Sequence, residues 1–269
     1  MAKPLAELVF NRTIDWFDDD SAIILHDISA ALTFIHGRGL GHGALTVLDV
    51  WMVPRPVAVG GAGIGGLDFA VQAIVGGLGL GQYVGGVQRR LATHAQQLQS
   101  DPAMAVDAPD AVRAHIFARY LDPALLAHQQ RHGVARNNNN NNEVDPLALL
   151  PVSATQAADL YSFGLLVYEL VTRVPLLVHA SPVEVQLQLA SGVRPPIDLR
   201  RWLANASVRH SEGESVVRRI RVGLVELLTR CWANNAGDRP TAARVEGTMT
   251  KIVDEIRRAW GVAVGVARI

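Results

Sequence analysis

Three glycines, Gly61, Gly63 and Gly66, have the spacing of a dinucleotide-binding fingerprint. In that fingerprint a strand leads through a glycine-rich turn into a helix, whose N-terminal N–H groups bind a pyrophosphate. An apolar stretch precedes Gly61, and the segment after Gly66 is long enough for a helix. The fingerprint also needs an acid about 20 residues further on, but no acid follows Asp68 until Asp101. Dinucleotide binding is therefore ranked third among the three hypotheses for the function of this chain.

Histidine and cysteine give weaker signals for chemistry. His128 and His132 have i, i+4 spacing and could share a metal ion if a third ligand approached. A solvated helix face explains the pair more simply, so no metal site is predicted. Cys231 is the single cysteine and cannot form an internal disulfide, which predicts the cytoplasm or another reducing intracellular compartment. Its place in an apolar segment predicts a buried core residue.

Helical periodicity dominates the elements that must position any site. A helix is predicted over residues 21–36, with Ser21 as N-cap and Gly37 as its end, followed by a loop and a short apolar strand. SPVE at residues 181–184 predicts a capping box with proline at the first helical position. The further predicted helices cover 87–99, 109–132 with a break near Asp122 and Pro123, 157–172, 181–190, 216–232 and 241–260.

Composition and charge exclude several classes of partner. Basic and acidic residues number 25 each, so no nucleic-acid partner is expected. Residues 57–86 are apolar, but they are crowded with glycine and contain Asp68, so no membrane span is expected. The run of asparagines from Asn137 to Asn142 has no apolar side chain to bury, which is typical of disordered segments.

Four blocks in one order resemble the C-lobe of a protein kinase from helix D onward. They are LAELVFNRTIDW (5–16), ILHDISAALTFIHGRGLGHGAL (24–45), ATQAADLYSFGLLVYELVTRVPL (154–176) and LLTRCWANNAGDRPTAARV (227–245). The closest likeness is to tyrosine-kinase-like kinases and to the kinase-homology domains of receptor guanylate cyclases. The resemblance implies a mainly α, C-lobe-like helical domain that lacks the N-lobe and has a long insertion in the activation segment. It divides the chain into a first C-lobe part (1–63), a glycine-rich and helical insertion (64–146) and a second C-lobe part (147–269).

The same resemblance implies that the catalytic loop is degenerate. The family's His-Arg-Asp falls on His42, Gly43 and Ala44, so the aspartate that accepts the substrate proton is replaced by alanine. The loop lysine falls on Thr46. The metal-binding asparagine falls on Asp49, which could hold a magnesium ion but does not restore the base.

The metal-holding carboxylate of the family's Asp-Phe-Gly segment is also expected to be missing. The favoured placement of that segment is Gly61 to Gly63, and a rival placement, Asp68 to Ala70, keeps the acid but lies far downstream. The phosphate-pairing lysine of the N-lobe has no counterpart, because Lys3 and Lys251 are the only lysines and neither matches its position. The chain is therefore not expected to bind ATP or any other cofactor.

Residues that support the loop are retained, according to the resemblance. Asp159 matches the helix-F aspartate that accepts backbone N–H bonds from the catalytic loop, and His42 matches the loop histidine that packs against helix F. Arg239 would normally pair with a glutamate at the end of the activation segment, but Val152 falls on that position. The ion pair is expected to be lost, or to be made by Glu143 or another acid.

These expectations favour a catalytically inactive kinase-like domain. It would act as a structural or adaptor subunit, through contacts with protein partners in a larger assembly. The alternative is a fragment of an active ATP-dependent protein kinase, and Ala44 argues against it.

Overall fold

The computed structural model describes residues 2–10, 18–55, 70–77, 116, 118–125, 151–177, 179–194 and 214–260. These residues form a mainly helical structure with one small sheet, which agrees with the predicted fold class at that level. The helices are α1 (Leu5–Phe10), α2 (Asp18–His36), α6 (Val152–Thr172), α7 (Pro182–Ala190), α9 (Glu214–Cys231), the short 3₁₀ helix η3 (Ala236–Asp238) and α10 (Ala242–Trp260).

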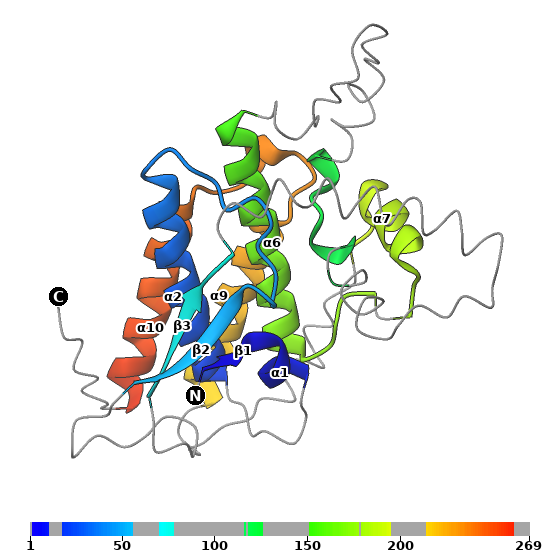
Figure 1. Ribbon diagram of the computed structural model, residues 1–269. Coiled ribbons are helices and arrows are strands. Elements are labelled where there is room, and N and C mark those ends of the chain that lie inside the picture. The colour runs from blue at the N-terminus through cyan, green and yellow to red at the C-terminus, as the bar shows by residue number, and fades with distance from the viewer. Residues whose placement is uncertain are drawn as a thin grey trace, which may run out of the picture.

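The sheet has three strands, β1 (Lys3–Pro4), β2 (Val50–Arg55) and β3 (Ala70–Val75), in the order β1-β2-β3. Both pairings are antiparallel, and Trp51 lies opposite Ile74. Side chains alternate between the faces of a strand, so buried Met52 and Ala73 share one face while Trp51 and Ile74, each more than 40% exposed, share the other. Contacts between α2 and β3 place the buried face against α2 (Figure 1).

Four long helices carry most of the structure. Helix α2 packs against α10 and α6, and α9 packs against α6, α10 and α2, while α7 stands apart from this group (Figure 1). Helices α6 and α9 approach closely at Gly164. A Cβ atom there would lie 3.1 Å from the Cβ of Cys231 and 3.3 Å from the backbone nitrogen of Trp232. The absence of a side chain at Gly164 therefore sets this helix contact.

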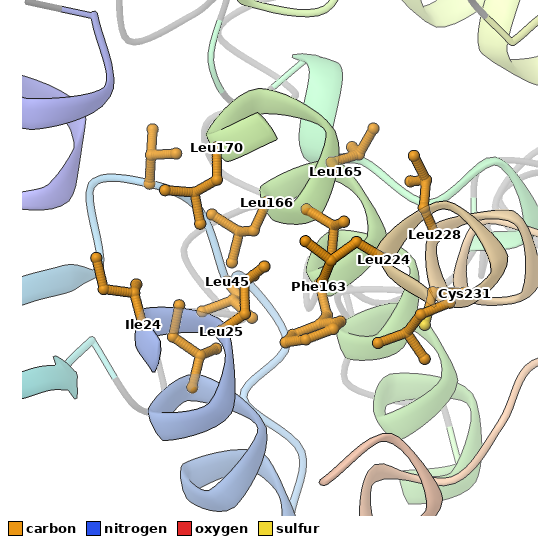
Figure 2. Packing of buried hydrophobic residues seen from close by; sticks show 14 of the residues in the cluster. Ile24, Leu25, Leu45, Phe163, Leu165, Leu166, Leu170, Leu224, Leu228 and Cys231 are labelled. Carbon is orange, nitrogen blue, oxygen red and sulfur yellow. The ribbon is translucent and has the colours of Figure 1, made fainter. Parts of the chain in front are cut away.

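One apolar cluster joins these helices. Figure 2 shows Leu25 of α2, Leu166 and Leu170 of α6, and Leu224 of α9 in that cluster. Cys231 is fully buried in it, as predicted, and burial raises the pKa of its thiol to about 12. A thiol with so high a pKa stays protonated and unreactive at neutral pH.

Most predicted helices are confirmed, with shifted ends. Helix α2 begins at Asp18, so Ser21 lies inside it as a buried residue and its prediction as N-cap is wrong. Helix α6 begins at Val152 rather than at residue 157. The capping box at α7 is present, because Ser181 accepts from the backbone nitrogen of Glu184 and the Glu184 carboxylate accepts from that of Ser181. The predicted helix over 87–99 and the Asn137–Asn142 tract lie outside the described residues.

Two parts of the predicted insertion over 64–146 belong to the main core. Strand β3 completes the sheet, and Ile116, Ala118 and Tyr120 are buried in the apolar cluster. Residues 118–120 and 123–125 are helical, with a bend between them. The bend lies at residues 121–122, so the predicted break near Asp122 and Pro123 is confirmed. These parts are integrated into the fold.

The stretch over 57–86 was expected not to span a membrane. Its described part contains strand β3. None of the helices in the described part of the chain is long and apolar enough to cross a bilayer.

Candidate functional site

The loop over residues 41–49 lies between α2 and β2 and is anchored in the core by apolar side chains. Leu45 and Val47 are fully buried, and Leu45 lies between side chains of α2 and of α6 (Figure 2). Helix α6 also holds the chain just before the loop, because the Gln156 amide donates to the carbonyl oxygens of His36 and Leu40. The loop therefore has a defined place at the junction of α2, α6 and the sheet.

Asp159 on α6 organises the loop backbone. Its two carboxylate oxygens accept from the backbone nitrogens of His42 and Gly43, each at 2.7 Å. The His36 ring lies 2.8 Å from the same oxygen that accepts from His42. Asp159 is only 1% exposed, so these short bonds compensate a carboxylate that would otherwise be costly to bury. Both backbone bonds that the resemblance implied for Asp159 are present.

His42 links the loop to the end of the sheet. Its Nε2 lies 2.6 Å from the carbonyl oxygen of Gly76, just after β3, and its Nδ1 accepts weakly from the backbone nitrogen of Ala44 at 3.4 Å. Because a carbonyl oxygen only accepts, Nε2 must carry the hydrogen. The ring is 1% exposed and fixed at both nitrogens. His42 is therefore a structural residue that contacts three parts of the protein: the loop, the hairpin formed by the antiparallel strands β2 and β3, and, through its backbone nitrogen, α6.

Asp49 closes the other end of the loop. One carboxylate oxygen accepts from the Thr46 backbone nitrogen at 2.8 Å and from the Thr46 hydroxyl at 2.7 Å. Its own carbonyl oxygen accepts from the Gly76 nitrogen at 2.7 Å. Burial raises the pKa of the Asp49 carboxyl above its ordinary value, although the bonds from Thr46 act in the opposite direction. Asp49 thus caps a turn and anchors the hairpin.

The loop position that the resemblance assigns to the proton acceptor has no acid–base group. Ala44 carries no proton acceptor, and Gly43 has a φ angle of +81° that a side chain would strain. Among the described residues, no group of three histidine, cysteine or acidic side chains could hold a metal ion. The predicted Gly61 position, its rival at Asp68, and His128 and His132 all lie outside the described residues.

Arg239 keeps a buried ion pair with a partner that the sequence did not reveal. Its guanidinium makes a two-pronged contact with Asp122, at 2.6 and 2.8 Å, and both side chains are 1% exposed. The remaining donors reach the carbonyl oxygens of Ala157 and Ala233. The expected loss of an ion pair at Arg239 is therefore wrong, and the alternative of another acid holds, with Asp122 as that acid. Glu143 lies outside the described residues.

A second buried charge cluster lies further along α6. Glu169 is fully buried, with Arg119 3.2 Å away, the Tyr120 hydroxyl donating at 2.7 Å and the Leu176 nitrogen donating at 3.2 Å. Burial raises the pKa of the Glu169 carboxyl, although Arg119 and these hydrogen bonds lower it. Sequence reasoning missed this cluster, and the only signal was an acid inside an apolar helix.

Comparison with models of protein families and with curated protein sequences finds no match to this chain.

Proposed function

We propose that this chain is a catalytically inactive, kinase-like domain that serves as a structural or adaptor subunit. The observation that supports it is a loop whose backbone is bonded by Asp159, Asp49 and His42. In the proposed alignment, Ala44 stands at the position of the proton acceptor. Phosphoryl transfer depends on positioning and on charge at the reacting atoms. Here the side chains that position the backbone remain, and the group that would take the proton is absent.

The hairpin supports a revised position for the missing metal carboxylate. The residue that touches both the loop histidine and Asp49 is Gly76, through its carbonyl oxygen and its nitrogen. In the proposed relationship, the family's Asp-Phe-Gly aspartate therefore corresponds to Gly76 rather than to Gly61. A Cβ atom at Gly76 would lie 3.6 Å from the Asp49 carbonyl oxygen and 3.7 Å from the Trp51 ring, which is ordinary contact distance.

This revision can be tested by putting the acid back. The variant Gly76→Asp places a carboxylate on the Asp49 side of the hairpin, and manganese binding is followed by electron paramagnetic resonance. We expect tighter Mn²⁺ binding than in the wild type, with Gly61→Asp as the matched control that leaves binding unchanged. Equal affinity in Gly76→Asp and wild type would reject the assignment of Gly76.

The dinucleotide hypothesis is less well supported. The fingerprint needs a helix after Gly66 and a parallel crossover, but residues 70–75 form a strand that pairs antiparallel with β2. Arg55 pairs directly with Ala70, so the glycine segment connects a hairpin. A flavin absorbance band in the purified chain would revive this hypothesis.

Absence of catalysis is tested with the purified chain, ATP, Mg²⁺ and a generic protein substrate. We expect no transfer of labelled phosphate and no saturable change in fluorescence on titration with ATP. The variant Asp49→Ala is the matched control, because label that survives it comes from a contaminating kinase. Transfer by the wild type that Asp49→Ala abolishes would overturn the proposal.

The adaptor role predicts association with other proteins. Trp51 and Ile74 form an exposed apolar pair on the outer sheet face, and Leu187 on α7 is 65% exposed. Exposed apolar side chains that lie together often mark binding surfaces. In size-exclusion chromatography with light scattering, the isolated chain should elute as an oligomer or an aggregate. When it is purified from its own cells, the chain should co-purify stoichiometrically with a partner. Clean monomeric behaviour in both preparations would count against the adaptor role.

A further inference from the structure

The segment over residues 118–125, called the strap below, lies along α6, contacts it directly at two levels and reaches a third level through Arg239. Near the C-terminal end of α6, Arg119 and Tyr120 of the strap contact Glu169. In the middle of α6, the Ser162 hydroxyl donates to the carbonyl oxygen of Tyr120. Near the N-terminal end, Asp122 reaches Arg239, which itself donates to the Ala157 carbonyl oxygen. The strap therefore runs antiparallel to α6.

Nearly every described side chain of the strap is buried, and two of them are charged. As whole residues, Arg119 and Asp122 are 5% and 2% exposed, and their partners Glu169 and Arg239 are 0% and 8% exposed. Lifting the strap would separate both pairs at once and leave Glu169 and Arg239 without their counter-charges. Separating a buried pair costs far more than separating a surface pair, because each charge loses its compensation.

Asp122 has a second task inside the strap. Its carboxylate accepts from the Ala124 nitrogen at 2.9 Å, and its carbonyl oxygen accepts from the Leu125 nitrogen at 3.0 Å. With Pro123 at the first helical position, Asp122 is the N-cap of the turn that follows. One side chain thus holds both the shape of the strap and its attachment to Arg239.

We infer that the strap is a conformational lock, closed by two buried charge clusters, one at Arg119 and one at Asp122. While the strap is closed, the face of α6 that it covers keeps one conformation. The Tyr120 hydroxyl is turned inward onto Glu169 and is reachable by a modifying enzyme only after the strap opens. The Ser162 hydroxyl donates to the strap and is buried, so it too becomes accessible only after the strap opens. This inference rests on contacts within the chain and is independent of the proposed function.

Hydrogen exchange followed by mass spectrometry tests the lock in the full chain. Amides that exchange only by local opening report the free energy of that opening. In the wild type, the Ala124 and Leu125 amides should be protected as strongly as amides in the middle of α6. Rapid exchange of the strap in the wild type would overturn the inference.

Two variants distinguish the contribution of the Asp122–Arg239 ion pair from that of the Asp122 N-cap. Arg239→Lys keeps the positive charge and the Asp122 cap but loses the two-pronged contact, so the strap should exchange at least about tenfold faster. Asp122→Ala removes both and should accelerate exchange about a hundredfold or more. Exchange in α10 should stay unchanged in Arg239→Lys, and Asp254→Asn, which removes an exposed ion pair, should leave the strap unchanged. An Arg239→Lys strap that exchanges like the wild type, or only together with α10, would refute the lock.

Discussion

Replacing Asp159 with asparagine tests the part of the site that holds the loop. The carboxylate accepts from the His42 and Gly43 nitrogens through different oxygens, at 2.7 Å each. Asparagine has one acceptor oxygen, so in either orientation its NH₂ group faces a backbone N–H. The change is nearly the same size as the native side chain, and the loss is therefore one of hydrogen bonding rather than of packing.

The expected cost follows from that geometry. A bond to a charged acceptor contributes about 1.5–3 kcal/mol, and a buried donor left without a partner adds to the loss. Asp159 is almost fully buried, so Asp159→Asn should lower the free energy of unfolding by about 2–4 kcal/mol. With a slope of roughly 2 kcal/mol per molar urea, the unfolding midpoint should fall by about 1–2 M.

The assay is urea unfolding followed by far-ultraviolet circular dichroism, since the fold is mainly helical. Asp254→Asn is the matched control, because Asp254 makes an exposed ion pair with Arg257 and should change stability by about 0.5 kcal/mol or less. A midpoint for Asp159→Asn within that control range would refute the view that Asp159 organises the loop.

Further changes test other parts of the structure. The Tyr161 hydroxyl is buried with no hydrogen-bond partner, so Tyr161→Phe should leave the urea midpoint unchanged or raise it, while Tyr120→Phe should lower stability by about 1–2 kcal/mol because it removes a bond to Glu169. Ser181→Ala should cost about 1 kcal/mol in thermal or urea unfolding, because it breaks the α7 capping box. Burial raises the pKa of Glu169 above its ordinary 4.5, so its protonation contributes stability that is complete below that pH and is lost as pH rises through the folded-state pKa. Unfolding midpoints from about pH 4 to about pH 8 should therefore fall less steeply in Glu169→Gln than in the wild type, and parallel curves would contradict the shift.

The helical part of the fold could be predicted because its signals are local. The spacing of apolar residues in α9 and α10 follows one helix face, and the SPVE motif encodes the start of α7 within four residues. Helix ends were less accurate. Helix α2 begins at Asp18, ahead of Ser21, because the cap preference of one serine, about 1 kcal/mol, is too small to fix a helix end by itself.

The site was only partly predictable, because its contacts join distant parts of the chain. Asp159 could be placed from the motif around it. Gly76 could not, because its role depends on the pairing of β2 with β3, and a glycine-rich segment gives no register signal. Asp122 lies 117 positions from Arg239, and nothing in the local sequence distinguishes it from Glu143 as a partner.

The buried acids among the described residues hold segments of the chain together, which supports the proposed structural role. Asp159, Asp122 and Glu169 are all buried, and each binds backbone nitrogens or a guanidinium of the same chain. Their bonding capacity is used to hold segments together. Ala44, which the proposed alignment places at the position of the proton acceptor, has a methyl group as its side chain. Buried charges that are fully engaged inside the protein stabilise one conformation, whereas catalysis needs a charged group whose partner is the substrate.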